Sequence, residues 1–308
     1  MWRWIFWIPC SPRSSVGEPR ARIVRPACFH LAWLFLLALL ACPIFAADKI
    51  HAKLSVPDSL TVPDRAVKLE GRLTRDNLLT KTGVGGEQIE FLVGGKKVGT
   101  SMTGGDGRGF LEYTPRMRGN LPLTVRLADS PRVTTAEGTA TLFSWERRRP
   151  ILLVEMAALI EDAGAPLVPL SSLAGDKTLP LSPTPIPDAA DELNRLTEFY
   201  FNVLYIARSQ SEAADSDTTR HWLREHRFPP GPIVFVPDKE EALTSKIDEF
   251  RAQGWDNLKA GIGRTKGFAD VLVAQRLDVV IVPATERGVL PKKAQLASTW
   301  KEVRKKRL

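Results

Sequence analysis

The stretch "RRRPILLVEMAALIEDAG", residues 147–164, indicates the fold of the second half of this chain. Its run ILLVEM, residues 151–156, follows three arginines and is almost wholly apolar. Such a run is typical of a strand that is buried on both faces of a parallel sheet. Glu155 and Ala157 come where this strand ends, so the loop that begins there is a candidate site.

Similar runs alternate with helical segments through residues 150–290. We expect a second strand at 202–207, helices at 191–201, 217–226 and 239–253, a third strand at 231–237, and the same alternation through 258–283. Strands that alternate with helices predict an α/β domain with a doubly wound parallel sheet. Ligands of such sheets bind beyond the carboxyl ends of the strands, which here means residues 155–159, 207–209, Asp238 and 261–270.

The preceding residues, 48–146, read as a different class of domain. Short segments with period-two alternation are separated by Gly, Pro, Asp and Asn turns, which predicts an all-β sandwich. Within it, Gly94-Gly95 suits a two-residue hairpin turn. The segment "FLVGGKKVGTSMTGGDGRGFLEYTP", residues 91–115, resembles bacterial immunoglobulin-like domains of envelope and surface proteins, which implies a spacing, docking or adhesive role. Asp106 in "GGDGRG" is one carboxylate, too few for a good calcium site, so we expect a turn there.

The N-terminal residues, 1–47, have the layout of a secretory signal peptide. In "FHLAWLFLLALLACPIFAAD", an apolar run of about a dozen residues follows three arginines and precedes small residues. We expect cleavage near Ala46 or Ala47 and export to the periplasm or cell envelope. Two alternatives remain open: an uncleaved membrane anchor through residues 29–46, and a lipoprotein that is lipidated at Cys42.

Charge and cysteine content limit the partners. The net charge of +8 comes partly from residues 146–149, 292–293 and the basic C-terminal tail 291–308. This charge suits an anionic membrane surface or solvated faces, and no nucleic-acid motif accompanies it. All three cysteines lie at or before position 42, so a cysteine metal site or disulfide framework is excluded after it. We also expect no zinc site at His221 and His226.

Several longer motifs resemble those of a known family. The segment 201–238, above all "TRHWLREHRFPPGP" at 219–232, together with "SKIDEF" at 245–250 and "AGIGRTKGFADVLVAQRLDVVIV" at 260–282, resembles the haloacid dehalogenase superfamily of aspartate-nucleophile phosphatases. Within that superfamily it is most similar to the lipin-like, bacterial phosphatidate phosphatase branch. The resemblance spans residues 150–285.

The resemblance implies roles for particular positions. Glu155 falls where the family has its nucleophilic aspartate, and Ala157 falls on the acid/base aspartate. Alanine cannot protonate a leaving group, and general acid catalysis typically contributes about 10²–10⁴-fold. The extra methylene of Glu155 displaces its carboxylate from the position of an in-line nucleophile. The first catalytic motif is therefore degenerate.

The other motif positions imply an anion site with little metal-binding capacity. By resemblance, Ser209 would supply the second motif's hydroxyl, and the cations that would hold a phosphate are Arg208, Lys246, Arg264 and Lys266. Asp270 is the one acidic residue left for magnesium, which needs several oxygen ligands, so we expect no cofactor.

From these positions we expect a catalytically inactive, exported phosphatase-like protein that binds an anionic, phosphate-bearing ligand or phospholipid, or a protein partner in the envelope. Three alternatives stay open: a phosphatase of altered mechanism that uses Glu155 and magnesium, a structural Glu155 paired with Lys246, and an interaction module in which the sandwich binds partners. Residues 164–190, rich in proline, form a loop or lid over the strand ends or a disordered insert.

Overall fold

The computed structural model describes residues 49–308 except 77–80, 162–182, 209–211, 238 and 285–289. The expected signal peptide or anchor, with Cys42, and most of the expected lid lie outside the described residues. Residues 48–308 form one compact unit. Within the described part of the chain, no helix combines the length and the apolar content that crossing a membrane requires.

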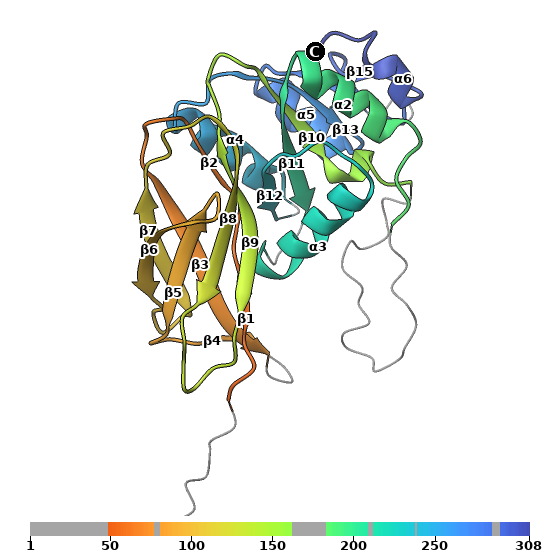
Figure 1. The fold of residues 1–308 in the computed structure, drawn as a ribbon. Coiled ribbons are helices and arrows are strands. Elements are labelled where there is room, and N and C mark those ends of the chain that lie inside the picture. Colours follow the sequence, from red (N-terminus) through yellow and green to blue (C-terminus); the bar gives the residue numbers. More distant parts are fainter. Residues whose placement is uncertain (1–48, 77–80, 162–182, 209–211, 238, 285–289) are drawn as a thin grey trace, which may run out of the picture. The chain divides into compact units, whose positions relative to one another are not determined.

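The first part of this unit is the predicted sandwich of two sheets (Figure 1). One sheet has five strands in the order β2 (Ser59–Thr61), β9 (Glu137–Ser144), β8 (Gly119–Leu127), β5 (Gln88–Val93) and β6 (Lys96–Met102). In the other sheet β3 (Val67–Asp76) pairs with β1 (Lys53–Ser55), β4 (Lys81–Gly83) and β7 (Arg108–Tyr113). The inward residues of both sheets form one core that includes Leu69, Ile89, Phe91, Val125 and Leu142. The predicted immunoglobulin-like sandwich is confirmed.

Two turns in the sandwich follow from their residue types. Gly94 and Gly95 connect β5 to β6 with φ values of 57° and 77°, a conformation that glycine adopts without steric cost. In the second turn, Oδ1 of Asp106 accepts a hydrogen bond from the backbone N–H of Arg108 at 3.0 Å. The Asp106 carboxylate thus closes the turn that the sequence predicts.

The second part is the predicted α/β domain, with a sheet of six parallel strands. The strands are β10 (Ile151–Glu155), β11 (Asn202–Arg208), β12 (Ile233–Val236), β13 (Leu258–Gly263), β14 (Asp278–Ile281) and β15 (Gln295–Leu296). Their spatial order is β12-β11-β10-β13-β14-β15, so the chain starts in the middle, runs to one side, and then returns to build the other. This is the order of a doubly wound sheet, and its direction reverses between β10 and β13.

Helices cover both faces of this sheet. On one face, α2 (Ala189–Phe199), α3 (Glu212–Glu225) and α6 (Trp300–Val303) pack against β10 and β11 through residues such as Leu193, Trp222 and Trp300. On the other, α4 (Glu240–Ala252) and α5 (Lys266–Ala274) pack through Leu243 and Phe268. A short 3-10 helix, η1 (Met156–Ala158), directly follows β10.

The C-terminal segment 291–308, which the sequence suggests is a basic tail, belongs to the α/β domain. It supplies β15, which pairs with β14, and helix α6. Among its basic residues are three apolar side chains that are fully buried in the core: Ala297, Trp300 and Val303. Burial of this apolar surface fixes the segment to the sheet.

A buried ion pair joins the sandwich to the α/β domain inside this compact unit. The carboxylate of Asp58, 2% exposed, lies 3.3 Å from Nε of Arg220 on α3. Arg220 also donates to the carbonyl oxygens of Val56 and Thr139, and the Asp58 carboxylate accepts from the backbone N–H of Thr141. Burial raises the pKa of Asp58, while Arg220 and backbone hydrogen bonds oppose the rise.

Candidate functional site

The first candidate site is the carboxyl end of β10, next to the point where the strand order reverses. Glu155 ends this strand and is 0% exposed. Its Oε2 accepts hydrogen bonds from the backbone N–H groups of Arg264 (2.8 Å) and Thr265 (2.9 Å), and its Oε1 accepts one from Oγ1 of Thr265 (2.6 Å). Both carboxylate oxygens are therefore engaged inside the protein.

These donors belong to the start of α5, which explains why a carboxylate is stable there. Thr265 is the N-cap of α5, and its Oγ1 also accepts from the N–H of Phe268. The first N–H groups of a helix have no partner within the helix and carry a partial positive charge, so they favour an anion. Glu155 supplies that anion from within the chain.

Glycine makes this close approach possible. A Cβ on Gly263 would lie 3.0 Å from Oε2 of Glu155 and 2.2 Å from a ring carbon of Phe268. Any larger residue would push the start of α5 away from β10.

The other predicted anion-binding cations have partners within the chain. Arg208 donates to the carbonyl oxygens of Pro237 (3.2 Å) and Lys239 (3.4 Å), and Arg264 donates to those of Ile160 (2.9 Å) and Glu161 (3.0 Å). These two side chains thus tie together loops at the carboxyl edge.

The two predicted lysines bind carboxylates. Lys246 lies in the middle of α4 and pairs with Glu249 at 2.7 Å. The alternative in which Lys246 pairs with Glu155 is therefore wrong. Lys266 pairs with Asp270 one turn along α5. Asp270, the remaining candidate for magnesium, is therefore engaged with a cation.

Three further predicted positions belong to this edge. Ala157 lies in η1, half-buried, and Ser209 and Asp238 lie outside the described residues. Among the residues that the structure describes, no three His, Cys, Asp or Glu side chains come together in a way that could hold a metal ion.

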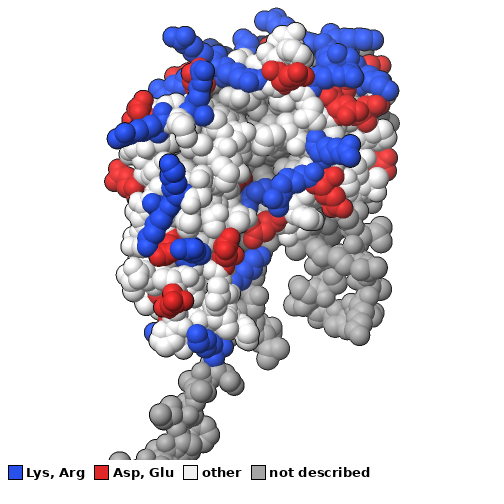
Figure 2. Space-filling view, in the orientation of Figure 1, with Lys and Arg blue, Asp and Glu red and all other residues white. Residues whose placement is uncertain are grey.

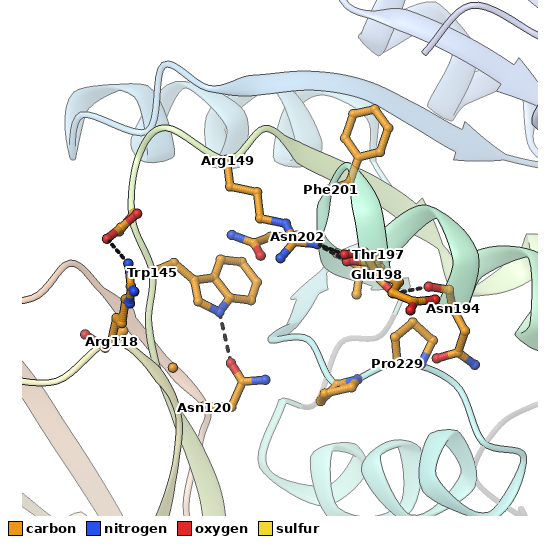
Figure 3. A pocket seen from close by; sticks show the side chains of 15 residues that line it. Arg118, Asn120, Trp145, Arg149, Asn194, Thr197, Glu198, Phe201, Asn202 and Pro229 are labelled. Carbon is orange, nitrogen blue, oxygen red and sulfur yellow. Dashed lines mark hydrogen bonds and ion pairs between the residues drawn. The ribbon is translucent and has the colours of Figure 1, made fainter.

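The second candidate site is a cavity of about 670 Å³ near the amino ends of β10, β11 and β12 (Figure 3). Sequence reasoning missed it because its walls come from both domains. Its charged and polar lining residues are Arg118, Asn120, Ser144, Glu146, Arg149, Asn194, Thr197, Glu198 and Asn202. Trp145, Phe201, Pro229 and Pro230 provide apolar surface.

Several hydrogen bonds hold the walls of this cavity in place (Figure 3). Nε1 of Trp145 donates to Oδ1 of Asn120 at 3.0 Å, and Arg118 pairs with Glu146 at 2.7 Å. Arg149 donates to the carbonyl oxygens of Thr197 and Glu198 at the end of α2. Arginine thus satisfies carbonyl groups that a helix end leaves open.

Other polar groups in the cavity lack a partner among the described residues. Oγ of Ser144, whose residue is 1% exposed, has no hydrogen-bond partner there. The side chains of Asn202 and Glu198 likewise make no hydrogen bond or ion pair within the described part of the chain. A buried hydroxyl without a partner costs free energy, which a bound ligand or water would recover.

Comparisons with known proteins give no family. No family model matches this chain. No curated protein matches it either.

Solved structures match the sandwich part at low scores. A fibronectin(III)-like module of CbhA from Clostridium thermocellum is 17% identical with a TM-score of 0.20, over 31% of this chain and 99% of that one. A CARDB domain from Pyrococcus furiosus is 14% identical with a TM-score of 0.23, over 31% and 86%. The D0-D1 domain of intimin is 14% identical with a TM-score of 0.22, over 30% and 46%. At these scores the sandwich assignment rests on its own sheet topology.

Proposed function

We propose that this chain is an exported, non-catalytic binding protein built on a phosphatase-like α/β scaffold. The observation that carries the proposal is the internal bonding of Glu155. A carboxylate that is 0% exposed and accepts three hydrogen bonds cannot approach a phosphorus atom or activate water without breaking them. Ala157, two residues further on, offers no proton.

The same geometry argues against phosphate binding at the start of α5. The backbone N–H groups of Arg264 and Thr265 would be the natural phosphate donors, but Glu155 already accepts from both. A phosphate there would also face the Glu155 carboxylate at short range, and like charges repel strongly where water is excluded. Export rests on the signal-peptide pattern of residues 1–47.

The cavity near the amino ends of the strands is the better place for a ligand. Two arginines and two glutamates balance its charge, and Arg118 and Glu146 neutralise each other. The unpartnered groups of Ser144, Glu198 and Asn202 provide both donors and acceptors. This chemistry suits a polar ligand of low net charge better than the phosphate-bearing anion that the sequence suggests.

The catalytic half of the proposal can be tested by hydrolysis of p-nitrophenyl phosphate and phosphatidic acid with magnesium. We expect the wild-type chain to show no turnover above that of Glu155→Gln, a variant of nearly equal size. Turnover by wild type that Glu155→Gln abolishes would overturn the proposal. A double variant, Glu155→Asp with Ala157→Asp, tests the ancestry of the scaffold, because both family aspartates are then restored.

The binding half can be tested by thermal unfolding with panels of sugars, amino acids and short peptides. A ligand that binds only the folded state stabilises it by about 2.7 kcal/mol at a concentration one hundred times its Kd. Asn202→Phe should remove the stabilisation by filling the cavity, and Gln88→Phe, at an exposed position of β5 outside the cavity, should retain it. Stabilisation that persists in Asn202→Phe would place the ligand elsewhere and count against the cavity.

A further inference from the structure

A basic surface lies at the amino edge of the parallel sheet. Because all six strands run in one direction, the segments that precede them meet at the same edge. These segments and residues 304–307 carry nine exposed cations, which we call the basic edge: Arg147, Arg148, Arg227, Arg276, Lys292, Lys293, Arg304, Lys305 and Arg307. Figure 2 shows Lys and Arg side chains crowded along the top of the view, where Figure 1 places the C-terminus.

Hydrogen bonds hold Arg307, one of the C-terminal cations, at this edge. The side chain of Gln295, the first residue of β15, donates to the carbonyl oxygen of Arg307 at 2.7 Å and accepts from its N–H at 3.0 Å. Arg307 also lies 3.6 Å from Asp278, the first residue of β14. Arg307 is thus part of the folded edge.

Most of the basic edge is not neutralised. Arg304 pairs with Glu192, Arg307 pairs with Asp278, and Arg147 contacts the carbonyl of Gln253. The remaining six cations have no ion-pair partner among the described residues: Arg148, Arg227, Arg276, Lys292, Lys293 and Lys305. The edge therefore presents a positive potential to any partner that approaches it.

Two exposed aromatic side chains stand at the same edge. Phe199 and Tyr200 end α2 just before β11, are 69% and 64% exposed, and have ring centroids 6.2 Å apart. Adjacent exposed aromatic rings beside cations are the combination that enters the headgroup region of a membrane. Neither ring lines the cavity.

We propose that the basic edge, with Phe199 and Tyr200, docks on an anionic phospholipid bilayer. The unpaired cations complement the headgroup charge, and the two rings insert at the boundary between headgroups and acyl chains. This inference is independent of the proposed binding function, since it uses a different set of side chains. The surface attraction extends over about 10 Å in 0.1 M salt, so several cations act together.

The test is co-sedimentation of the full chain with vesicles of phosphatidylcholine, alone or with about a third phosphatidylglycerol. Each cation near the surface strengthens binding about fivefold. Lys292→Gln with Lys293→Gln should therefore weaken binding to anionic vesicles by roughly 25-fold. The matched control, Lys49→Gln with Arg75→Gln, removes the same charge from exposed sandwich positions and should have little effect.

Three results would overturn the proposal: equal binding to neutral and anionic vesicles, equal loss in the edge and control variants, or binding to duplex nucleic acid without binding to vesicles. The first would also reveal binding through the N-terminal apolar segment, which is identical in all variants. Phe199→Ala with Tyr200→Ala should weaken binding on the order of tenfold even at about 1 M salt, where charge attraction is screened. If that double variant binds as wild type does, the rings do not insert.

Discussion

The two edges of the parallel sheet hold their charges in opposite ways. At the carboxyl edge, Glu155 is buried and accepts hydrogen bonds from Arg264 and Thr265. At the amino edge, exposed cations such as Lys292 and Lys293 have no ion-pair partner among the described residues. A charge that is satisfied internally contributes to the fold, whereas an exposed, unpaired charge remains available to a partner.

The candidate ligand site lies at the edge of the sheet opposite to the one that the fold alone suggests. Doubly wound sheets bind ligands beyond the carboxyl ends of their strands, at the point where strand order reverses. Here that point, between β10 and β13, contains the side chain of Glu155, and the 670 Å³ cavity lies near the amino ends. The fold therefore indicates where a ligand site is expected, and the side chains at that position determine whether a ligand can bind there.

The largest expected effect concerns another buried carboxylate, Asp58. Arg220→Met would leave Asp58 buried without its cation, and loss of one partner of a buried pair costs about 3–5 kcal/mol. Urea denaturation of the two proteins measures this difference in the free energy of unfolding.

A double variant checks the cause. Asp58→Asn added to Arg220→Met removes the unpaired charge and should recover a large part of the loss. A loss that the double variant does not reduce would mean that Arg220 acts through its bonds to the carbonyls of Val56 and Thr139 instead.

The next effect tests the structural role of Glu155 directly. Glu155→Ala should lower the free energy of unfolding by about 3 kcal/mol, because it leaves the N–H groups at the start of α5 without an acceptor. Glu155→Gln should lower it by about 1 kcal/mol, since its amide oxygen still accepts from both N–H groups. Lys293→Gln at the opposite edge should change it by less than about 0.5 kcal/mol. If urea denaturation shows equal effects of Glu155→Ala and Lys293→Gln, then Glu155 contributes no more to folding stability than an exposed cation does.

A smaller effect is expected at Thr265, which links Glu155 to α5. Thr265→Val keeps the shape of the side chain but removes both the N-cap acceptor and the hydroxyl that donates to Glu155. We expect a loss of about 1–2 kcal/mol, measured in the same way. Thr265→Ser retains both hydrogen bonds and should stay within about 0.5 kcal/mol of wild type. If Thr265→Ser loses as much as Thr265→Val, the methyl group rather than the hydroxyl matters.

The architecture was predictable from sequence because periodicity is local. Alternation through residues 48–146 and apolar runs such as ILLVEM report burial over a few residues, and they identify the sandwich and the parallel sheet correctly. The turn at Gly94-Gly95 was predictable for the same reason. Trp300 and its apolar neighbours were overlooked because basic residues dominate the C-terminal segment.

The candidate sites were less predictable because their residues are distant in sequence. The position of Glu155 follows from the end of its strand, but its partners at 264 and 265 are set by the pairing of β10 with β13. Thr265 directly precedes the apolar segment 266–274, and a threonine in that position is a recognisable N-cap signal. The cavity combines residues 118–120, 144–149, 194–203 and 229–230, which no local pattern brings together.

The smallest expected effect is the pH dependence that comes from Asp58. Burial raises the pKa of this carboxyl above its ordinary value of 3.8, and Arg220 limits the rise. The folded protein therefore keeps the proton to a higher pH than the unfolded chain does. Protonation of Asp58 thus contributes stability that is fully present below pH 3.8 and is lost as the pH rises through the raised pKa.

Asp58→Asn cannot titrate and isolates this contribution. We expect the free energy of unfolding of wild type, relative to Asp58→Asn, to fall as the pH rises from 3.8 and then to level off. Urea denaturation of both proteins across this range measures the difference. A relative stability that instead rises with pH would mean that attraction to Arg220 outweighs the cost of burial. The ion pair would then favour folding in its charged form, and Asp58, like Glu155, would be a carboxylate whose charge the interior fully compensates.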